Sequence, residues 1–387
     1  MGPEDILYNC MLNPVERRTV VDRTQAFCPN RDGPATGRSG KGNICVHSQK
    51  ERRFICRQCG KTFAERIATP FYRLRTPTET VTRVVTLLAH GCPIQAIVAA
   101  FGFDERTVAD WLDRAALHCR AVHEHLVETP RRLGQVQADE LRVKMQGAIV
   151  WMAMAVMVTT RLWLGVEVSP HRDLSLIRRL MQRVRRCALA GRILICTDGL
   201  CAYVRAARET FRDQVAPGRR GRQPWRVWGQ LLIAQGVKRY ENRRVVAVER
   251  RVVHGRAEQA EKARVASSGE GVINTAYIER LNGTFRERLA SLARRTRGLA
   301  RTVTRLEAGM WLVGTVYNVC TPHASLREVA GKVVRDRPPA MAAGITRPCW
   351  RVRELLLSHV PPARWTPPKK RGRHSRETLA LIEQWCQ

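Results

Sequence analysis

A change in hydrophobic periodicity near residue 134 constrains the fold more than any other feature of this sequence. Residues 78–126 carry apolar side chains at helical spacing, whereas residues 135–168 read as three strands, GQVQADELRV, AIVWMAMAVMV and LWLGVEV. A helix at 174–187 and a short, continuously apolar strand, RILICTD, come next. Strands interleaved with helices in this way predict an α/β domain that follows a helical one.

Charge restricts the partners of such a chain. The 67 Lys and Arg residues outnumber the 34 Asp and Glu residues, which gives a net charge of +33. An excess of this size repels itself unless a polyanion offsets it. Nucleic acid is the expected polyanion, and an anionic membrane surface is the alternative. We expect no membrane contact, because we find no convincing basic amphipathic helix and the longest apolar run, Ala148 to Val158, is too short to span a bilayer.

Cysteine usage bears on the compartment and on metal binding. An odd count of 13 cysteines in a long chain, with no export signal in residues 1–21, leads us to expect reduced thiols in a cytoplasm. Cys56 and Cys59, in ICRQCGKTF, have the spacing at which two thiolates bind one tetrahedral ion. With Cys28, in FCPN, they predict a zinc-ribbon-like segment at 26–68 that holds one structural zinc ion.

The fourth zinc ligand is unknown. The position where a ribbon would carry it holds Asp32 and Gly33. Cys45 and His47 are possible substitutes, although neither has knuckle spacing. A degenerate ribbon that no longer binds zinc is the alternative interpretation.

Residues 76–126 have the proportions of a helix-turn-helix domain. The apolar stripe is broken at Gly91 and Gly102, which divides it into three helices, and Asp104 is placed to cap the third. In such a domain the third helix enters the DNA major groove with its N-terminal residues, so we predict DNA contacts by Arg106 and Thr107. A plain three-helix bundle would give the same pattern.

Three acidic residues occupy positions next to expected core segments, where a charged side chain is energetically unfavourable. Asp139 lies at the start of the first sheet strand, Asp198 ends the buried strand ILICTDG, and Glu279 lies on a helix beside the core stripe. Glu140 should face away from this site, because side chains alternate along a strand. Three acids brought together repel one another unless cations lie among them, and hard oxygen ligands suit Mg²⁺ or Mn²⁺. Taken singly, each acid is more simply a helix cap or a surface ion-pair partner.

The order of these motifs resembles a known family. QADEL, TDGLCAY and INTAYIERLNGTFRERL, placed after a Cys knuckle and a helix-turn-helix and followed by YNVCTPHASLR, are similar to the DDE transposases of bacterial insertion sequences. The resemblance covers about residues 28–327. It implies a ribonuclease-H-like mixed sheet with flanking helices, on which Asp139, Asp198 and Glu279 are catalytic and bind two Mg²⁺ or Mn²⁺ ions. The 80 residues between Asp198 and Glu279 are long for the simplest members.

This interpretation divides the chain into five segments. They are an irregular N-terminus at 1–25, the zinc-ribbon-like segment at 26–68, the helix-turn-helix domain at 76–126, a catalytic core at 134–327 with an insertion at about 205–272, and a basic, Pro-rich tail at 328–387. C-terminal to Glu279 in the sequence, we expect Arg286, Arg294 and Arg295 to bind DNA phosphates; a solvated charged face is the alternative.

The resemblance predicts a transposase that acts on double-stranded DNA. It would bind terminal inverted repeats as a homodimer, cleave a strand at each end and join the 3′-hydroxyl to a target, in a bacterial cytoplasm at the nucleoid. Two alternatives stay open: a DNA-binding regulator derived from a transposase with an inactive core, and a Mg²⁺-dependent nuclease that cuts without joining.

Overall fold

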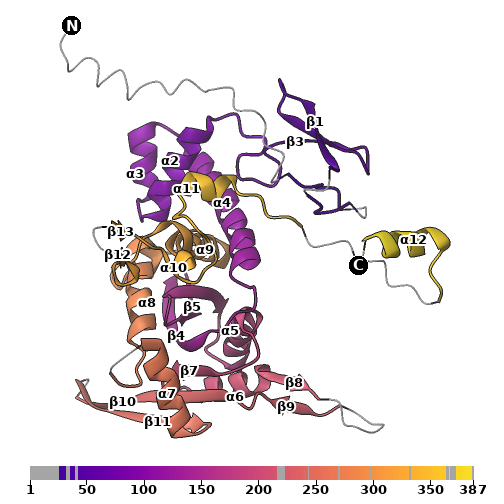
Figure 1. The fold of residues 1–387 in the computed structure, drawn as a ribbon. Helices are drawn as coiled ribbons and strands as arrows, with labels where there is room; N and C mark the ends of the chain where they lie inside the picture. Colours follow the sequence, from indigo (N-terminus) through magenta and orange to yellow (C-terminus); the bar gives the residue numbers. More distant parts are fainter. Residues whose placement is uncertain are drawn as a thin grey trace. The chain divides into compact units, whose positions relative to one another are not determined.

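A computed structural model of the chain describes residues 26–31, 35–39, 42–215, 223–242, 244–268, 271–296, 298–330, 333–362, 366 and 372–385. The chain forms two compact units (Figure 1). The larger unit is Arg75–Ser358, and the smaller one combines Met1–Leu74 with His359–Gln387. The segment 1–25, expected to be irregular, lies outside the described residues.

A six-stranded mixed sheet forms the centre of the larger unit. Its strand order is β11-β10-β7-β4-β5-β6. The strands β4, β5 and β6 are antiparallel neighbours, β7 runs parallel to β4, and β10 runs parallel to β7. The α/β class and the mixed sheet are thereby confirmed. The bounds are Gly134–Met145 for β4, Ala148–Met157 for β5, Leu162–Ser169 for β6, Ile193–Thr197 for β7, Leu231–Glu241 for β10 and Arg244–His254 for β11.

Helices cover both faces of this sheet (Figure 1). α5 (Leu174–Cys187) packs on β5 and β6, beside α6 (Cys201–Thr210). On the other face, Leu141 and Val143 of β4 share one apolar cluster with α8 (Ala276–Arg288) and α9 (Val303–Cys320). α7 (Ala257–Ser268) covers β7 and β10 on that same side through two buried alanines. β10 lies within the range that we expected as an insertion and is a full member of the sheet.

Three helices precede the sheet: α2 (Thr78–Ala89), α3 (Ile94–Phe101) and α4 (Glu105–Leu126). Gly102 ends α3 with a φ of 69°, a left-handed conformation that glycine adopts without strain. The side chain of Asp104 accepts a hydrogen bond of 2.8 Å from the backbone N–H of Arg106 and so caps α4. The helical prediction for 78–126 is confirmed, with both breaks at the expected glycines.

The second half of α4 is part of the core. Cys119 O accepts a hydrogen bond of 3.1 Å from Thr315 of α9, and His123 donates one of 3.2 Å to Leu164 O of β6. Gly314 lets α9 lie directly against the Trp163 ring, since a Cβ there would come within 2.2 Å of a ring carbon. The three N-terminal helices and the sheet therefore belong to one unit.

Part of the segment expected as a basic tail is folded onto the larger unit. β12 (Glu328–Ala330) and β13 (Val333–Arg335) form a hairpin, and α10 (Pro339–Ala342) and α11 (Val352–Leu357) follow. The carbonyl of Leu355 in α11 accepts a hydrogen bond of 3.0 Å from His118 of α4. Two short helical turns, η1 (Ala290–Leu292) and η2 (Ala324–Leu326), and a small hairpin of β8 (Arg212–Gln214) and β9 (Trp225–Val227) complete the unit.

The smaller unit is built on a three-stranded antiparallel sheet. Its strands are β1 (Ile44–Ser48), β2 (Arg53–Cys56) and β3 (Thr62–Ala64). In its small core the rings of Phe54 and Phe63 pack together, with their centres 5.6 Å apart. α12 (Arg376–Trp385) belongs to the same unit. Over the described residues, none of the helices has the length and apolarity that a membrane crossing requires.

Candidate metal centre and nucleic-acid interface

Strand register brings two of the predicted acids together. β4 and β7 pair in parallel from Gly134↔Ile193 to Gln137↔Cys196. Two residues further on, Asp139 in β4 and Asp198 just after β7 therefore lie side by side. The carboxyl ends of neighbouring parallel strands are a usual place for ligand-binding side chains in α/β sheets.

Glu140 is the third member of this group. One carboxylate oxygen each from Asp139, Glu140 and Asp198 lies within 4.8 Å of the other two. We call these three residues the acidic cluster. The expected alternation holds: Asp139 Oδ2 accepts a hydrogen bond of 2.8 Å from Asn282 of α8, whereas Glu140 Oε2 accepts one of 2.8 Å from Tyr203 of α6. The inference that Glu140 lies away from the site is wrong. Asp198 follows the last residue of β7, and its carboxylate lies close to side chains from both faces of β4.

Glu279 lies beside the acidic cluster, outside the group of three. The backbone N–H groups of Tyr277 and Ile278 at the start of α8 donate to Gln137 Oε1 at 2.9 and 3.0 Å, which fixes this helix on β4. Glu279 Oε1 accepts hydrogen bonds from Lys238 Nζ at 2.8 Å and from Thr275 Oγ1 at 2.9 Å. Lys238 comes from β10, so a cation of the chain stands next to this acid.

A second cation of the chain contacts the acidic cluster. Arg172, in the loop between β6 and α5, donates from both Nε and Nη2 to Glu140 Oε1 and reaches Asp198 Oδ2 at 3.3 Å. Its guanidinium also lies 5.1 Å from the centre of the Trp151 ring. The Glu140 side chain is fully buried, so its charge requires such a partner.

The electrostatics of the cluster reflect burial and crowding of like charges. Burial, followed by the charge of Glu140, raises the pKa of Asp139 to about 6, and Asp198 and Glu279 add to this. Burial and the charge of Asp198 also raise the pKa of Glu140. For Glu279, burial acts to raise the pKa, but the hydrogen bonds from Lys238 and Thr275 and the charge of Lys238 together outweigh burial and lower the value. A cation placed among these acids would relieve the repulsion.

The donor set fits a hard divalent ion. Carboxylate oxygens are the ligands that Mg²⁺ and Mn²⁺ take in proteins, and three lie close enough here to share one ion. No nitrogen or sulfur ligand belongs to this group among the described residues, so the chemistry does not favour zinc.

The predicted DNA-contacting residues lie in two places. Arg106 is exposed and Thr107 half-buried at the N-terminal end of α4. Arg286 lies half-buried in the last turn of α8, and Arg294 and Arg295 are exposed just after η1. These positions leave the guanidinium groups of Arg106, Arg294 and Arg295 accessible to a phosphate.

A separate cluster of thiols lies in the smaller unit. The sulfur atoms of Cys28, Cys56 and Cys59 all lie within 4.8 Å of one another, and Cys28 Sγ is 3.5 Å from Cys59 Sγ. Within the described residues, this group contains neither Cys45 nor His47. Burial raises the pKa of Cys28 to about 12. Three convergent sulfur ligands suit a soft or borderline metal ion.

Sequence reasoning missed four residues that shape the acidic cluster: Glu140, Arg172, Tyr203 and Lys238. Each is separated in sequence from its partner by at least 26 residues, and Glu140 approaches Asp198 only through the pairing of β4 with β7. Glu140 and Tyr203 carried a local signal, because they stand in QADEL and TDGLCAY, two of the stretches on which the resemblance rests. The others needed the tertiary structure.

The comparisons with known proteins add no family to this picture. The chain matches none of the protein-family models, and none of the curated protein sequences matches it.

Proposed function

We propose that this protein is a DDE transposase, a metal-dependent enzyme that cleaves and rejoins DNA strands. The observation that carries the proposal is the meeting of Asp139, within β4, and Asp198, just after the end of the parallel strand β7, with Glu140 in the same cluster. Glu279 is close enough for its charge to raise the pKa of Asp139. The substrate would be double-stranded DNA at terminal inverted repeats, bound by a homodimer in a bacterial cytoplasm at the nucleoid.

The sheet supports a ribonuclease-H-like interpretation of the core. Three antiparallel strands, β4 to β6, are followed through α5 by β7 and through α6 by β10, both running parallel to β4. The acids then come from the first strand, from the end of the first parallel strand and from a helix packed on the opposite face to α5 and α6. This is the chain order that the resemblance implies.

Two Mg²⁺ or Mn²⁺ ions, when bound, would supply charge stabilisation for in-line phosphoryl transfer between an attacking hydroxyl or water and the DNA strand. Asp139, Asp198 and Glu279 would hold them. The chain's own groups set these acids in place: Asn282 orients Asp139, Thr275 holds Glu279, and the Leu200 N–H donates to Asp198 Oδ1 at 3.0 Å. Glu140 shares the negative field and could act as an additional ligand.

The other elements support a DNA substrate. The net charge of +33 favours a polyanion, and the capped N-terminus of α4 with exposed Arg106 is suited to a major groove. In the smaller unit, the three-thiol cluster fits a zinc ribbon that would help to position DNA. We propose zinc on Cys28, Cys56 and Cys59, with a fourth ligand still to be identified.

A second candidate function is favoured by the cations around the acids. Arg172 pairs with Glu140 and Asp198, and Lys238 pairs with Glu279, so the chain itself neutralises charge that metal ions would otherwise offset. A protein in which these pairs are permanent would bind DNA without cutting it, as a regulator derived from a transposase. A Mg²⁺-dependent nuclease differs only in the absence of strand joining.

Incubation with the DNA that flanks its own gene tests these proposals. With Mg²⁺ we expect strand cleavage and joined products, and with EDTA neither. Asp139→Asn, Asp198→Asn and Glu279→Gln should each abolish cleavage while the protein still binds the ends, because each change removes a ligand charge at nearly constant shape. Binding without cleavage by the wild-type protein would support the regulator, and cleavage without joined products would support the nuclease.

A further inference from the structure

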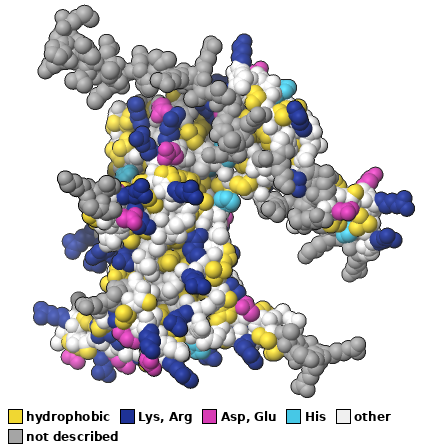
Figure 2. Space-filling view, in the orientation of Figure 1, with side chains coloured by type: hydrophobic (Ala, Val, Ile, Leu, Met, Phe, Trp, Pro, Cys, Tyr) yellow, Lys and Arg dark blue, Asp and Glu magenta, His cyan; other side chains and the backbone are white. Residues whose placement is uncertain are grey.

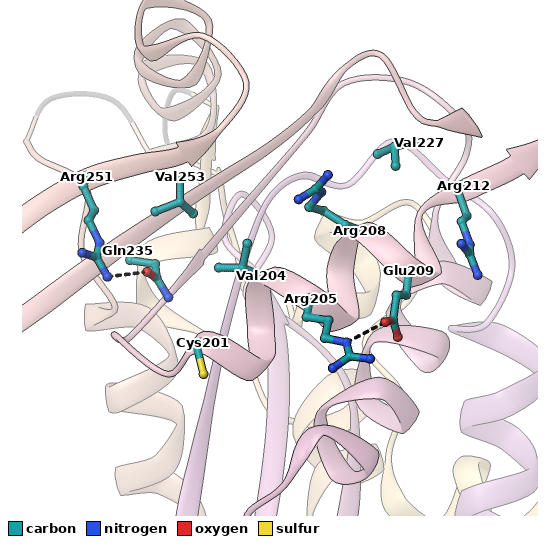
Figure 3. A pocket seen from close by; sticks show the side chains of 10 residues that line it. All are labelled: Cys201, Val204, Arg205, Arg208, Glu209, Arg212, Val227, Gln235, Arg251 and Val253. Atoms are coloured by element: carbon teal, nitrogen blue, oxygen red, sulfur yellow. Dashed lines mark hydrogen bonds and ion pairs between the residues drawn. The ribbon is translucent and has the colours of Figure 1, made fainter. Parts of the chain in front are cut away.

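A cavity of about 620 Å³ lies outside the acidic cluster, on the α6 side of the sheet (Figure 3). Its walls come from α6, from the β8–β9 hairpin and from β10 and β11. In Figure 3 the side chains of Val204 and Arg208, from α6, and of Val253, from β11, lie around it. The volume is within the range of cavities that hold a nucleotide-sized ligand.

The lining is positively charged. Among the described residues that line it, Glu209 is the one with a carboxylate, and it already pairs with Arg205 at 2.8 Å and with Arg178 at 2.6 Å. Over the described part of the chain, Arg208 and Arg212 form no ion pair. Their charge in the pocket is therefore not offset by the protein, and the ligand that fits is an anion.

An apolar wall and an exposed indole adjoin these arginines. Val204, Val227 and Val253 line the pocket. Trp225, two residues before Val227 in β9, points to the same side of that strand and is 51% exposed. The guanidinium of Arg212 lies 4.9 Å from the centre of its ring. Aromatic and apolar surfaces beside cationic groups are the arrangement with which proteins bind unpaired bases and their phosphates.

One buried side chain connects this pocket to the acidic cluster. Gln235 of β10 is 2% exposed; its Nε2 donates to the carbonyl oxygen of Asp198 at 2.9 Å, and its Oε1 accepts from Arg251 at 3.1 Å. Arg251 and Gln235 both line the cavity. A ligand there would thus lie one side chain away from the backbone of Asp198.

We propose that this pocket, continued by Trp225, binds an unpaired nucleotide of the DNA strand next to the cleavage site. Arg208 and Arg212 would hold its phosphate, and the valines and the indole would contact its base. A base paired and stacked in a duplex cannot enter a cavity, so the ligand is single-stranded. The placement of DNA here rests on the proposed function. A free nucleotide has the same chemistry, and the experiment separates the two sources.

Fluorescence anisotropy in EDTA, with the full-length protein, tests the pocket without cleavage. The probes are a labelled 15-nucleotide single strand, the duplex of the same sequence and a labelled nucleoside triphosphate. Arg208→Ala should weaken single-strand binding about tenfold and Trp225→Ala at least about fivefold, while duplex binding changes less than twofold. Both side chains are exposed, so the variants should fold. Lys262→Ala, which removes one exposed charge from α7, is the matched control and should change neither affinity.

Cys201 gives a second readout, because its exposed thiol lines the same pocket. The bound single strand should slow its alkylation by N-ethylmaleimide at least fivefold and leave Cys349 unaffected. Equal losses of single-strand affinity in Arg208→Ala and Lys262→Ala would contradict the proposed pocket. So would alkylation of Cys201 at the same rate with and without the bound single strand. Tighter binding of the free nucleotide than of the strand would overturn DNA as its source. Because no step requires metal, a failed cleavage assay with intact pocket binding would count against the proposed function alone.

Discussion

Two neighbouring acids, Asp139 and Glu140, show how a site can draw on both faces of a strand. Their side chains leave β4 in opposite directions, toward α8 and toward α6. Both carboxylates nevertheless lie close to Asp198, because Asp198 comes directly after the last residue of β7. The alternation of side chains along a strand correctly predicted that Asp139 and Glu140 point in opposite directions. It could not predict their distances to Asp198, which depend on the register between β4 and β7.

Glu140→Gln should therefore reduce cleavage strongly instead of leaving it nearly unchanged. The substitution removes one of three clustered charges, and it leaves Arg172 with only Asp198 as a partner. We expect a loss of at least about tenfold in the cleavage rate at fixed Mg²⁺, relieved in part at higher Mg²⁺. Glu258→Gln removes an exposed acid of α7 that pairs with Lys262, and it serves as control. Wild-type rates in Glu140→Gln would exclude this residue from the site.

The cysteine cluster makes a prediction at the same scale. If Cys28, Cys56 and Cys59 hold zinc, the purified protein contains about one zinc ion per chain, and Cys56→Ser lowers that content and unfolds the strands β1 to β3. Cys45→Ser, which changes a thiol outside the cluster, should keep the metal. Elemental analysis by mass spectrometry measures both. Full zinc content in a Cys28→Ser, Cys56→Ser double variant would place the metal elsewhere.

At the scale of elements, the two ends of α4 lie in different environments. Its first turn is capped and exposed, and its second half is buried against α9 and β6. The sequence predicted the three helices because their apolar period is regular. It did not indicate that 22 residues of helix would extend far enough to join the sheet, since the buried side chains of α4 fit an isolated bundle equally well.

The exposed end of α4 should read DNA sequence. Arg106→Ala combined with Thr107→Ala is expected to reduce the preference for the terminal repeats over random DNA, at roughly 1–3 kcal/mol for each lost base contact. Arg114→Ala, on the same helix but paired with Asp110, should change that preference little. Competition binding with both DNAs measures the ratio. A uniform loss on both DNAs would indicate phosphate contacts only.

The buried end of α4 should make the fold acid-sensitive. The ring of His123 packs between those of Trp163 and Trp311, with centre-to-centre distances of 4.7 and 5.3 Å. Burial lowers the pKa of His123 to about 3. Below about pH 6.5 the unfolded chain therefore takes up a proton that the folded chain does not, and the free energy of unfolding falls as pH falls, by up to about 1.4 kcal/mol per pH unit until about pH 3.

Denaturant unfolding at pH 7 and pH 5 checks this effect. His123→Phe keeps an aromatic ring in place and should lose less stability than wild type between the two pH values, with a difference of up to about 2 kcal/mol. His125→Phe changes an exposed histidine of the same helix and should behave as wild type. The same pH dependence in His123→Phe as in wild type would assign the acid sensitivity to other groups.

At the scale of the whole molecule, the strands and helices were predictable and their assembly was only partly so. The runs at 135–168, 174–187 and 193–198 became β4 to β6, α5 and β7, because long apolar patterns specify local structure. β10 lies in the range that we expected as an insertion, because the stretch before it is Arg-rich and reads as a loop, so its place in the central sheet was not predicted. The ion pairs of Arg172 and Lys238 with the acids depend on contacts between distant segments, which no local pattern encodes.

These pairs make metal binding the decisive property of the molecule. If the acids form a metal centre, divalent ions must compete successfully with Arg172 and Lys238. If the pairs are permanent, the protein binds DNA and no ion at this place. Cleavage assays report this only indirectly, because DNA ends and assembly must also be correct.

Mn²⁺ binding, followed by electron paramagnetic resonance of the free ion, tests the centre directly. We expect saturable binding of up to two ions per wild-type chain, displaced by excess Mg²⁺, and loss of at least one ion in Asp139→Asn and in Asp198→Asn. Zinc should stay bound in all three proteins, which shows that the smaller unit is intact. No saturable Mn²⁺ binding by the wild type, or unchanged binding by both variants, would contradict the assignment of these carboxylates as a metal centre.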